Sequence, residues 1–222
     1  MNPSQLLIIL IPLAYLIGSI PFGLIVAKRR GVDPRTAGSG NIGATNVGRL
    51  LGKKFFFIVF FLDMLKSLVP MLIASMAVHR IPEAGRDRSI YLLWLLVGIA
   101  AVLGHMFSVF LRFKGGKGVA TSAGLMLGLV PYFTLPGVIA IVAFIVVFFA
   151  FRYVSLGSIV GACVFPLAYL GIGLARHWPV TQSQLPLLLL SFFLAGMIVF
   201  RHRTNIQRLM NGTENRFVKK AA

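Results

Sequence analysis

The chain has 222 residues, 58% of them hydrophobic, and a mean hydropathy of +0.89, which excludes a soluble globular domain. Its 22 Lys and Arg residues against 5 Asp and Glu residues give a net charge of +17. No basic helix or aromatic platform stands outside the apolar segments, so the charge indicates loop anchors that meet anionic lipid headgroups, rather than nucleic-acid binding. The composition predicts a polytopic membrane protein with one membrane-embedded domain over residues 1–222.

Long apolar segments follow one another along the chain and predict an all-α fold of seven transmembrane helices. The uncharged run 118–151 has 34 residues and contains Pro131 and Pro136. As one helix it would be about 51 Å long, which is too long for a single span, so it predicts two short helices. The predicted spans are 5–27, 55–78, 90–111, two within 118–151, 153–175 and 185–200.

The distribution of Lys and Arg orients these predicted helices. With seven spans and the N-terminus outside, 17 of the 22 basic residues fall in cytoplasmic segments and four fall outside, while Lys66 lies within a span. Six spans would split the loop charges almost evenly, with 11 inside and 10 outside. Cytoplasmic loops carry an excess of Lys and Arg, so the seven-span arrangement with a cytoplasmic C-terminus is favoured.

The first polar loop, residues 38–49, joins the first two predicted spans. It has a G-x-G-x-x-G spacing at Gly38, Gly40 and Gly43, but it lacks the strand and the later acidic residue of a dinucleotide-binding unit. Small residues let backbone amides approach an anion closely, and Arg49 adds a fixed positive charge. The loop therefore predicts a site for a phosphate ester; the alternative is a flexible glycine loop.

The second polar loop lies between the third and fourth predicted spans, where two lysines flank a Gly-Gly pair at 114–117. It is not a Walker A loop, because Gly118 follows Lys117 where Ser or Thr is needed. Lys117 can still act as a point charge for phosphate, or the lysines can serve only as topology anchors. His105, near the end of the preceding span, is either a hydrogen-bonded helix-end histidine or a functional one.

The polar tail begins at Arg201, where the last predicted span reaches the cytoplasm. His202 and Asn205 are three residues apart and share a helical face. A histidine here can act as a general base or donate to phosphate near neutral pH. Glu214 is one acid among many cations, and we expect it to form a structural pair with one of them. The alternative is a basic tail that lies on anionic lipid.

Smaller signals lie within the predicted helices. Asp63 and Lys66 are three residues apart in the second span, and we expect them to neutralise each other as a structural pair. Ser155 lies at a cytoplasmic membrane edge, where it can complete a site. Cys163, in an apolar run, is expected to be a small core residue. The four histidines are scattered and the acids are few, so neither a metal site nor a cofactor is predicted.

Together and in this order, the polar motifs resemble the PlsY family of bacterial acyl-phosphate:glycerol-3-phosphate acyltransferases. The resemblance rests on the loop from Ser39 to Arg49, the Phe-Lys-Gly-Gly-Lys-Gly-Val-Ala-Thr run from Phe113, and the His-Arg-x-x-Asn-Ile tail from His202. The early Gly-Ser-Ile-Pro-Phe run also fits, and the length and span layout are similar from end to end. The H-x-x-x-x-D pair of thioester-dependent glycerolipid acyltransferases is missing.

The resemblance implies a monomer in the bacterial cytoplasmic (inner) membrane, with seven helices around a cytoplasm-facing site that uses neither metal nor cofactor. The donor would be a long-chain acyl phosphate rather than acyl-CoA, the acceptor glycerol 3-phosphate, and the product lysophosphatidic acid. The catalytic residues carried over from the family are Ser39, Arg49, Lys117, His202 and Asn205. The carried-over substrate-binding residues are Gly40, Asn41, Gly43, Thr45, Asn46, Lys114, Gly115, Gly116 and Ser155.

Two other classes of protein fit parts of the sequence. A transporter for a phosphorylated or anionic solute would also have several spans and cationic loops. Its substrate residues should lie near mid-bilayer, where only Asp63 and Lys66 are expected and where they can pair with each other. A lipid-binding scaffold would leave the serine, the asparagines and the histidine of the motifs without a role. The enzyme is therefore the favoured reading.

Overall fold

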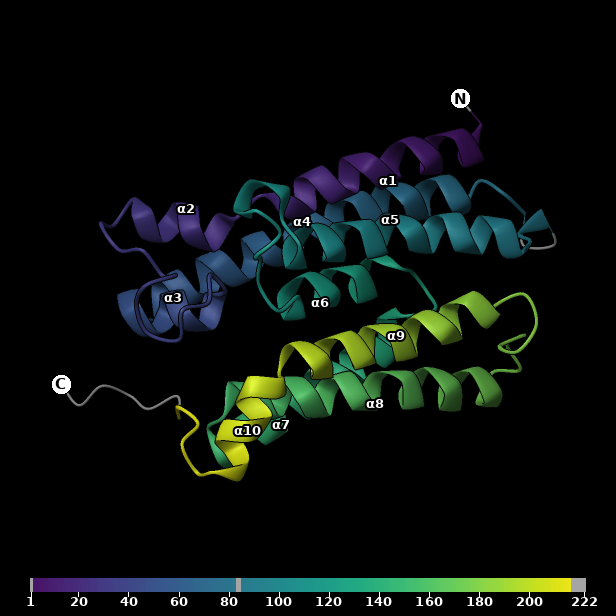
Figure 1. The fold of residues 1–222 in the computed structure, drawn as a ribbon. Helices are drawn as coiled ribbons and strands as arrows, with labels where there is room; N and C mark the ends of the chain where they lie inside the picture. The colour runs from purple at the N-terminus through teal and green to yellow at the C-terminus, as the bar shows by residue number, and fades with distance from the viewer. Residues whose placement is uncertain (1, 83–84, 217–222) are drawn as a thin grey trace. The chain divides into compact units, whose positions relative to one another are not determined.

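The computed structural model describes residues 2–82 and 85–216, and every regular element in these residues is a helix (Figure 1). The all-α prediction is therefore confirmed. The structure consists of two compact units, Met1–Pro131 and Tyr132–Ala222. The single domain expected from the sequence stays a prediction, because two compact units can belong to one domain.

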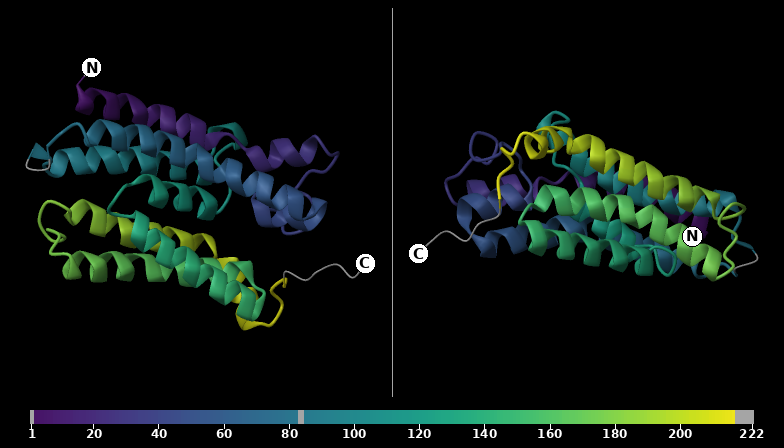
Figure 2. Two further views of the ribbon diagram at one scale, coloured as in Figure 1. Left: turned by 180° about the vertical axis from the view of Figure 1, so that it is seen from behind. Right: turned by 90° about the horizontal axis from the view of Figure 1, so that it is seen from below.

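The first unit contains α1 (Pro3–Ser19), α2 (Phe22–Lys28), α3 (Ala44–Leu51), α4 (Lys53–Val78), α5 (Arg88–Met106), a 3-10 turn η2 (Val109–Leu111) and α6 (Val119–Gly128). Helix α1 runs alongside α5, and α4 packs against α1, α5 and α6 (Figures 1 and 2). Small residues permit the close contact between α1 and α5: a Cβ added at Gly18 or Gly104 would overlap the backbone of the facing helix.

The first predicted span is one run in the sequence but two helices in the structure. Pro21 lacks a backbone N–H, and α1 ends just before it while α2 begins just after it. The break leaves two backbone carbonyls that other elements satisfy. Ser108 donates from Oγ to the carbonyl of Ser19 at 2.6 Å, and Lys66 donates from Nζ to the carbonyl of Ile20 at 3.1 Å.

The second unit contains α7 (Thr134–Phe151), α8 (Val154–Ala175), α9 (Leu185–Arg201) and α10 (Arg203–Met210). Helix α8 packs against both α7 and α9. Its buried residues include Tyr169, whose hydroxyl donates to Gln184 Oε1 at 3.0 Å. Cys163 is exposed on α8, so the sequence-based expectation of a core cysteine is wrong.

In the described part of the chain, five helical segments are long and apolar enough to cross a membrane, or six if the bent α9–α10 pair counts as one span. They include α1 with α2, α4, α5 with η2, α7 and α8. Helix α6 has 10 residues, or about 15 Å, which is half of a hydrocarbon core of about 30 Å. A multi-pass membrane protein is therefore confirmed, while seven full spans are not.

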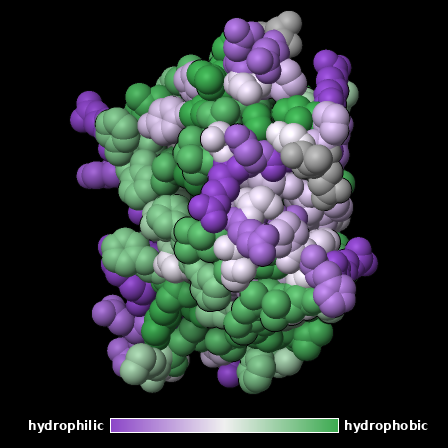
Figure 3. All heavy atoms as spheres, turned by 90° about the vertical axis from the view of Figure 1, so that its right-hand side faces the viewer, coloured by the Kyte–Doolittle hydropathy of each residue, from purple (hydrophilic) through white to green (hydrophobic). Residues whose placement is uncertain are grey.

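Large apolar side chains also cover much of the surface. Ile8, Phe57, Val146 and Leu189 are each more than half exposed. A soluble protein would bury such a set, whereas a membrane protein turns it to lipid. The face drawn in Figure 3 shows hydrophilic side chains gathered beside apolar ones, a mixture expected where membrane helices end.

Candidate active site

The loop at 38–43 is organised by one buried side chain, that of Asn46 on α3. Its Oδ1 accepts from the Ser39 amide at 2.8 Å. Its Nδ2 donates to the carbonyls of Pro34, Ala37 and Asn41 at 2.9, 3.0 and 2.8 Å. The carboxamide thus makes its hydrogen bonds within the polar segment and shapes it, while the assignment of Asn46 to substrate binding stays a prediction.

The glycines of this loop serve its backbone path. Gly38 and Gly40 have φ values of +62° and +71°, which favour glycine. The amide of Gly40 donates to the Ala37 carbonyl at 3.2 Å, and that of Gly43 to Asn41 Oδ1 at 2.8 Å. The amides of Ser39, Gly40 and Gly43 are thus paired inside the loop, and the expected use of loop amides for an anion stays a prediction.

Arg49 is carried by α3, which is anchored through its apolar face. Ala44 and Val47 belong to a buried cluster with Ala27 and Val59. Thr45 and Arg49 are four residues apart and therefore share a face of the same helix. Arg49 is half-buried at the edge of this arrangement, so its position is fixed by a packed helix and not by a loop alone.

The second polar loop folds back onto the end of α5. The Gly115 amide donates to the Met106 carbonyl at 3.1 Å, and the Gly116 amide donates to the His105 carbonyl at 3.0 Å. A Cβ added at either glycine would overlap the His105–Met106 segment. The two glycines are therefore explained by close packing. Lys114 is exposed, while Lys117 is half-buried just before the start of α6.

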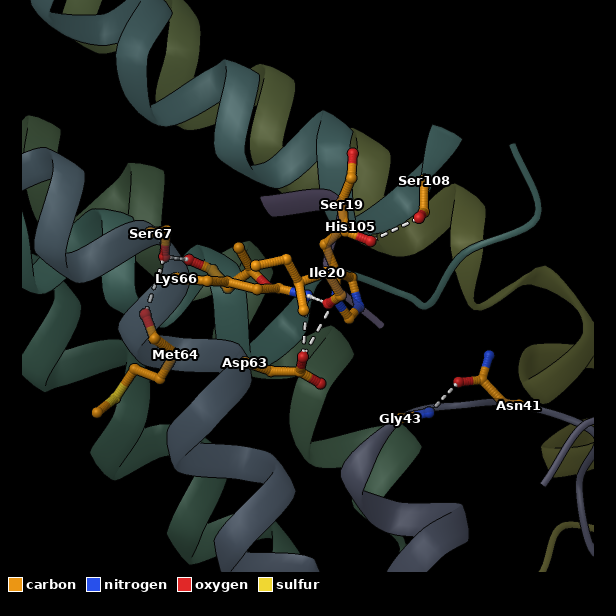
Figure 4. A network of polar contacts seen from close by, with 11 residues as sticks. Ser19, Ile20, Asn41, Gly43, Asp63, Met64, Lys66, Ser67, His105 and Ser108 are labelled. Carbon is orange, nitrogen blue, oxygen red and sulfur yellow. Dashed lines mark hydrogen bonds and ion pairs between the residues drawn. The ribbon is translucent and has the colours of Figure 1, made fainter. Parts of the chain in front are cut away.

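A buried charged cluster lies beside this loop (Figure 4). Asp63 and Lys66 on α4 form an ion pair, with Nζ 2.9 Å from Oδ1. His105 Nδ1 lies 3.7 Å from the same Asp63 oxygen. All three side chains are buried, and Lys66 also donates to the Ile20 carbonyl. A transporter would need the charges of Asp63 and Lys66 for its substrate, but these two side chains pair with each other.

In the second unit, Glu214 gathers the residues of the polar tail. Its Oε1 accepts from Ser155 Oγ at 2.9 Å and from Asn205 Nδ2 at 2.7 Å, and its Oε2 accepts from Arg208 Nε at 2.7 Å. Burial would raise the pKa of this carboxyl, but the hydrogen bonds from Asn205, Arg208 and Ser155 outweigh burial and hold the pKa below its usual range. Glu214 therefore stays ionised and holds Ser155 and Asn205 in place.

His202 lies at the junction of α9 and α10 and is almost fully buried, with 3% of its surface exposed. Its Nδ1 is 2.8 Å from the carbonyl of Ile198, which can only accept. Nδ1 therefore carries a proton in this contact, and Nε2 is the ring atom able to take one up. Asn205 follows one turn later on α10, on the same face.

The structure groups the predicted residues in each unit. In the first unit, Asn46 joins Ser39 and Asn41, and the Gly-Gly pair lies against His105. In the second unit, Glu214 joins Ser155 and Asn205. The sequence did not predict the contact between His105 and Gly116, and no spacing rule would have found it. Among the described residues, no group of three or more His, Cys, Asp or Glu side chains is placed to hold a metal ion.

Comparison with known proteins gives a consistent result. A family model described as glycerol-3-phosphate acyltransferase matches residues 8–212. Curated glycerol-3-phosphate acyltransferases of Geotalea daltonii and Aquifex aeolicus are each 44% identical, covering 95% and 94% of this chain and 97% of their own lengths. Two crystal structures of PlsY, an integral membrane glycerol 3-phosphate acyltransferase, are 40% identical. The glycerol 3-phosphate form has a TM-score of 0.80 and covers 96% of both chains; the lysophosphatidic acid form has a TM-score of 0.78 and covers 96% of this chain and 95% of its own.

Proposed function

The chain belongs to the glycerol-3-phosphate acyltransferase family, and on that premise we propose that it transfers a long-chain acyl group from an acyl phosphate to the sn-1 hydroxyl of glycerol 3-phosphate. The products are lysophosphatidic acid and inorganic phosphate. The assignments of acceptor and product rest on one observation: the similar solved structures are described as a glycerol 3-phosphate form and a lysophosphatidic acid form. The chain covers nearly their whole length, so the activity applies to the whole protein.

An acyl phosphate donor suits the chemistry of the side chains that the chain offers. It is a mixed anhydride, so its phosphate is already a good leaving group, and the enzyme mainly has to position two anions and stabilise charge. The glycerol oxygen bonds to the acyl carbon, the bond from that carbon to the phosphate oxygen breaks, and the phosphate leaves. The hydroxyl proton passes to a base, and no acyl-enzyme is needed.

The cationic residues of the first unit are assigned to the phosphate groups. Arg49 presents a planar guanidinium with several donors, which matches phosphate oxygens, and Lys117 is a point charge. Both are assigned to the phosphate of glycerol 3-phosphate. Ser39 is assigned to the acyl phosphate through its hydroxyl. Thr45 and Lys114 lie beside these residues in sequence and are assigned to substrate binding. Asn46 and the two glycines of the second loop are assigned to shaping the two loops, as their contacts support.

The polar residues of the second unit are assigned to the acceptor. His202 offers Nε2 to the glycerol hydroxyl, since Nδ1 is engaged with the Ile198 carbonyl. Asn205 and Ser155 are assigned to glycerol 3-phosphate, with Glu214 as the structural residue that holds both. Asp63 and Lys66 are structural as well. The protein is proposed to act as a monomer, and its other partners are membrane lipids.

We also propose seven crossings of the bacterial inner membrane, with the N-terminus outside and the polar motifs on the cytoplasmic face. The excess of Lys and Arg in the proposed cytoplasmic segments supports this topology. In a Cys163→Ser background, single cysteines replacing Arg80 or Arg176 should react with a membrane-impermeant maleimide in intact cells. Cysteines replacing Lys53 or Arg152 should react only after permeabilisation, and the opposite pattern would overturn the topology.

The donor is tested with the purified protein in detergent. Glycerol 3-phosphate is offered with palmitoyl phosphate and, in parallel, with palmitoyl-CoA. We expect lysophosphatidic acid from palmitoyl phosphate and none from palmitoyl-CoA, because the leaving group must be a phosphate that the cationic residues can hold. Equal product from palmitoyl-CoA would show that the donor assignment is wrong while leaving the acceptor assignment intact.

A further inference from the structure

His105 is a buried histidine that the proposed reaction does not use, and it is packed between the Asp63–Lys66 ion pair and the second polar loop. It lies one residue before the end of α5, and 5% of its surface is exposed. On one side, Nδ1 faces the Asp63 carboxylate at 3.7 Å. On the other side, the ring is so close to Gly116 that a Cβ added there would overlap Nε2. The imidazole thus fills the space between a buried acid and the second polar loop.

The acid side of this arrangement is rigid. Asp63 is one residue of the helix α4, and Lys66 one turn later neutralises it at 2.9 Å. Lys66 is itself held by the Ile20 carbonyl, which the break between α1 and α2 exposes. Figure 4 shows Lys66 and His105 converging on Asp63 from two different helices. Buried ionic groups in such a setting fix side-chain positions, since any displacement leaves a charge without compensation.

The loop side is tied to His105 through its backbone as well as its ring. The His105 carbonyl accepts from the Gly116 amide at 3.0 Å, and the Met106 carbonyl accepts from the Gly115 amide at 3.1 Å. Lys117 follows Gly116 directly, and Gly118, with φ of +85°, then opens α6. The backbone conformation of Gly116, which precedes Lys117, therefore depends on the position of the His105 ring.

We propose that His105 is a positioning residue for acyl transfer: packed between Asp63 and the second polar loop, its ring supports the Gly115–Gly116 turn and thereby orients Lys117 for a substrate phosphate. The inference rests on the proposed function, in which Lys117 binds the phosphate of glycerol 3-phosphate. The residues that support the reaction would then extend from the proposed cytoplasmic loop to Asp63 and Lys66 of α4, which lie within a membrane-spanning helix.

The test is a set of steady-state measurements that vary glycerol 3-phosphate and palmitoyl phosphate separately. His105→Ala should raise KM for glycerol 3-phosphate by about tenfold or more, because a small misplacement of a binding group is costly. KM for palmitoyl phosphate should change less than about twofold, as expected for a group that does not share its contacts. His105→Asn keeps an amide N–H near the place of Nδ1 and should restore most of the affinity.

A double-mutant cycle identifies the group through which His105 acts. In a Lys117→Ala background, adding His105→Ala should change KM for glycerol 3-phosphate by less than about twofold, since the interaction has already been lost. Gly116→Ala pushes a methyl group against the His105 ring from the loop side. Like His105→Ala, it should raise KM for glycerol 3-phosphate and leave KM for palmitoyl phosphate nearly unchanged. If His105→Ala does not fold, His105→Asn and Gly116→Ala still carry the test.

Matched controls come from elsewhere in the chain. His79 is another histidine at a helix end, but it follows the C-terminal end of α4, and its Nδ1 lies 2.7 Å from the Ser75 carbonyl oxygen. Gly171 on α8 has open space where a Cβ would go. His79→Ala and Gly171→Ala should both retain wild-type constants.

Three outcomes would overturn the proposal. The first is that His105→Ala and Gly116→Ala both keep the wild-type KM for glycerol 3-phosphate. The second is that KM rises equally for glycerol 3-phosphate and palmitoyl phosphate. The third is that His105→Ala raises KM for glycerol 3-phosphate as much in the Lys117→Ala background as in the wild type. An equal rise with a lowered melting temperature would assign His105 to folding alone. The wild-type assay keeps this result separate from the proposed function, because a folded wild-type protein that makes no lysophosphatidic acid removes the function itself.

Discussion

Arg49→Ala reduces acyl transfer to the assay background while the protein stays folded and inserted in the membrane. We expect a loss in kcat/KM on the order of 10³-fold, the size found when a preorganised charge-stabilising donor is removed. Two anionic substrates have to approach each other, and Arg49 supplies a fixed positive charge that offsets their repulsion. Because α3 is anchored by Ala44 and Val47, losing the guanidinium should leave its packing intact.

Two further variants sharpen this experiment. Arg49→Lys keeps the charge but loses the planar donors, so it should recover only part of the rate. Arg35→Ala is the matched control: Arg35 lies three residues before the first polar loop, is exposed, and hydrogen bonds to Asp33, whose pKa it holds at about 2. We expect Arg35→Ala to transfer acyl groups at the wild-type rate. Retained activity in Arg49→Ala would remove Arg49 from the reaction.

His202→Ala lowers kcat by about 10²- to 10⁴-fold, the range attributed to a positioned general acid or base. Its Nδ1 donates to the Ile198 carbonyl, so Nε2 is the ring atom that can act as the base. The pH dependence of kcat/KM should show an acidic limb in the wild type, because a protonated ring cannot accept the proton. That limb should be absent from the residual activity of the variant.

The control for His202 is a second histidine of the same unit. His177 follows α8 and has φ of +53°, so Asn is the suitable replacement because it tolerates this region. His177→Asn should keep the wild-type rate and pH profile. If His202→Ala raised KM for glycerol 3-phosphate but kept kcat and the acidic limb, His202 would be a binding residue, and a substrate phosphate would be the better candidate for the proton.

The positions of the helices follow closely from the sequence. The predicted second span, 55–78, falls within α4, and the predicted division of 118–151 appears as α6 and α7 with Pro131 between them. Hydrophobic length and proline carry this information locally. The break at Pro21 within the first span was not predicted, although the same property of proline causes it. Helix α6 is short, as predicted, but with 10 residues it is too short to be one of the two predicted spans.

The site was predictable where its contacts are local. The pairing of Asp63 with Lys66 follows from a spacing of three residues on a helix. The cation that pairs with Glu214 could not be chosen beforehand, because Arg208 is brought to it by the chain reversal after α10, where Gly212 has φ of +68°. The hydrogen bonds of Asn46 to the loop backbone could not be predicted, because they join residues up to 12 positions apart through an irregular chain path.

The most direct test of the proposed reaction is its stoichiometry. Purified wild-type protein receives labelled palmitoyl phosphate with and without glycerol 3-phosphate, and lysophosphatidic acid and inorganic phosphate are measured in the same samples. We predict that the two products appear together in equal amounts and that neither forms without glycerol 3-phosphate. Phosphate release without lysophosphatidic acid, or no product from folded protein, would contradict the proposed transfer.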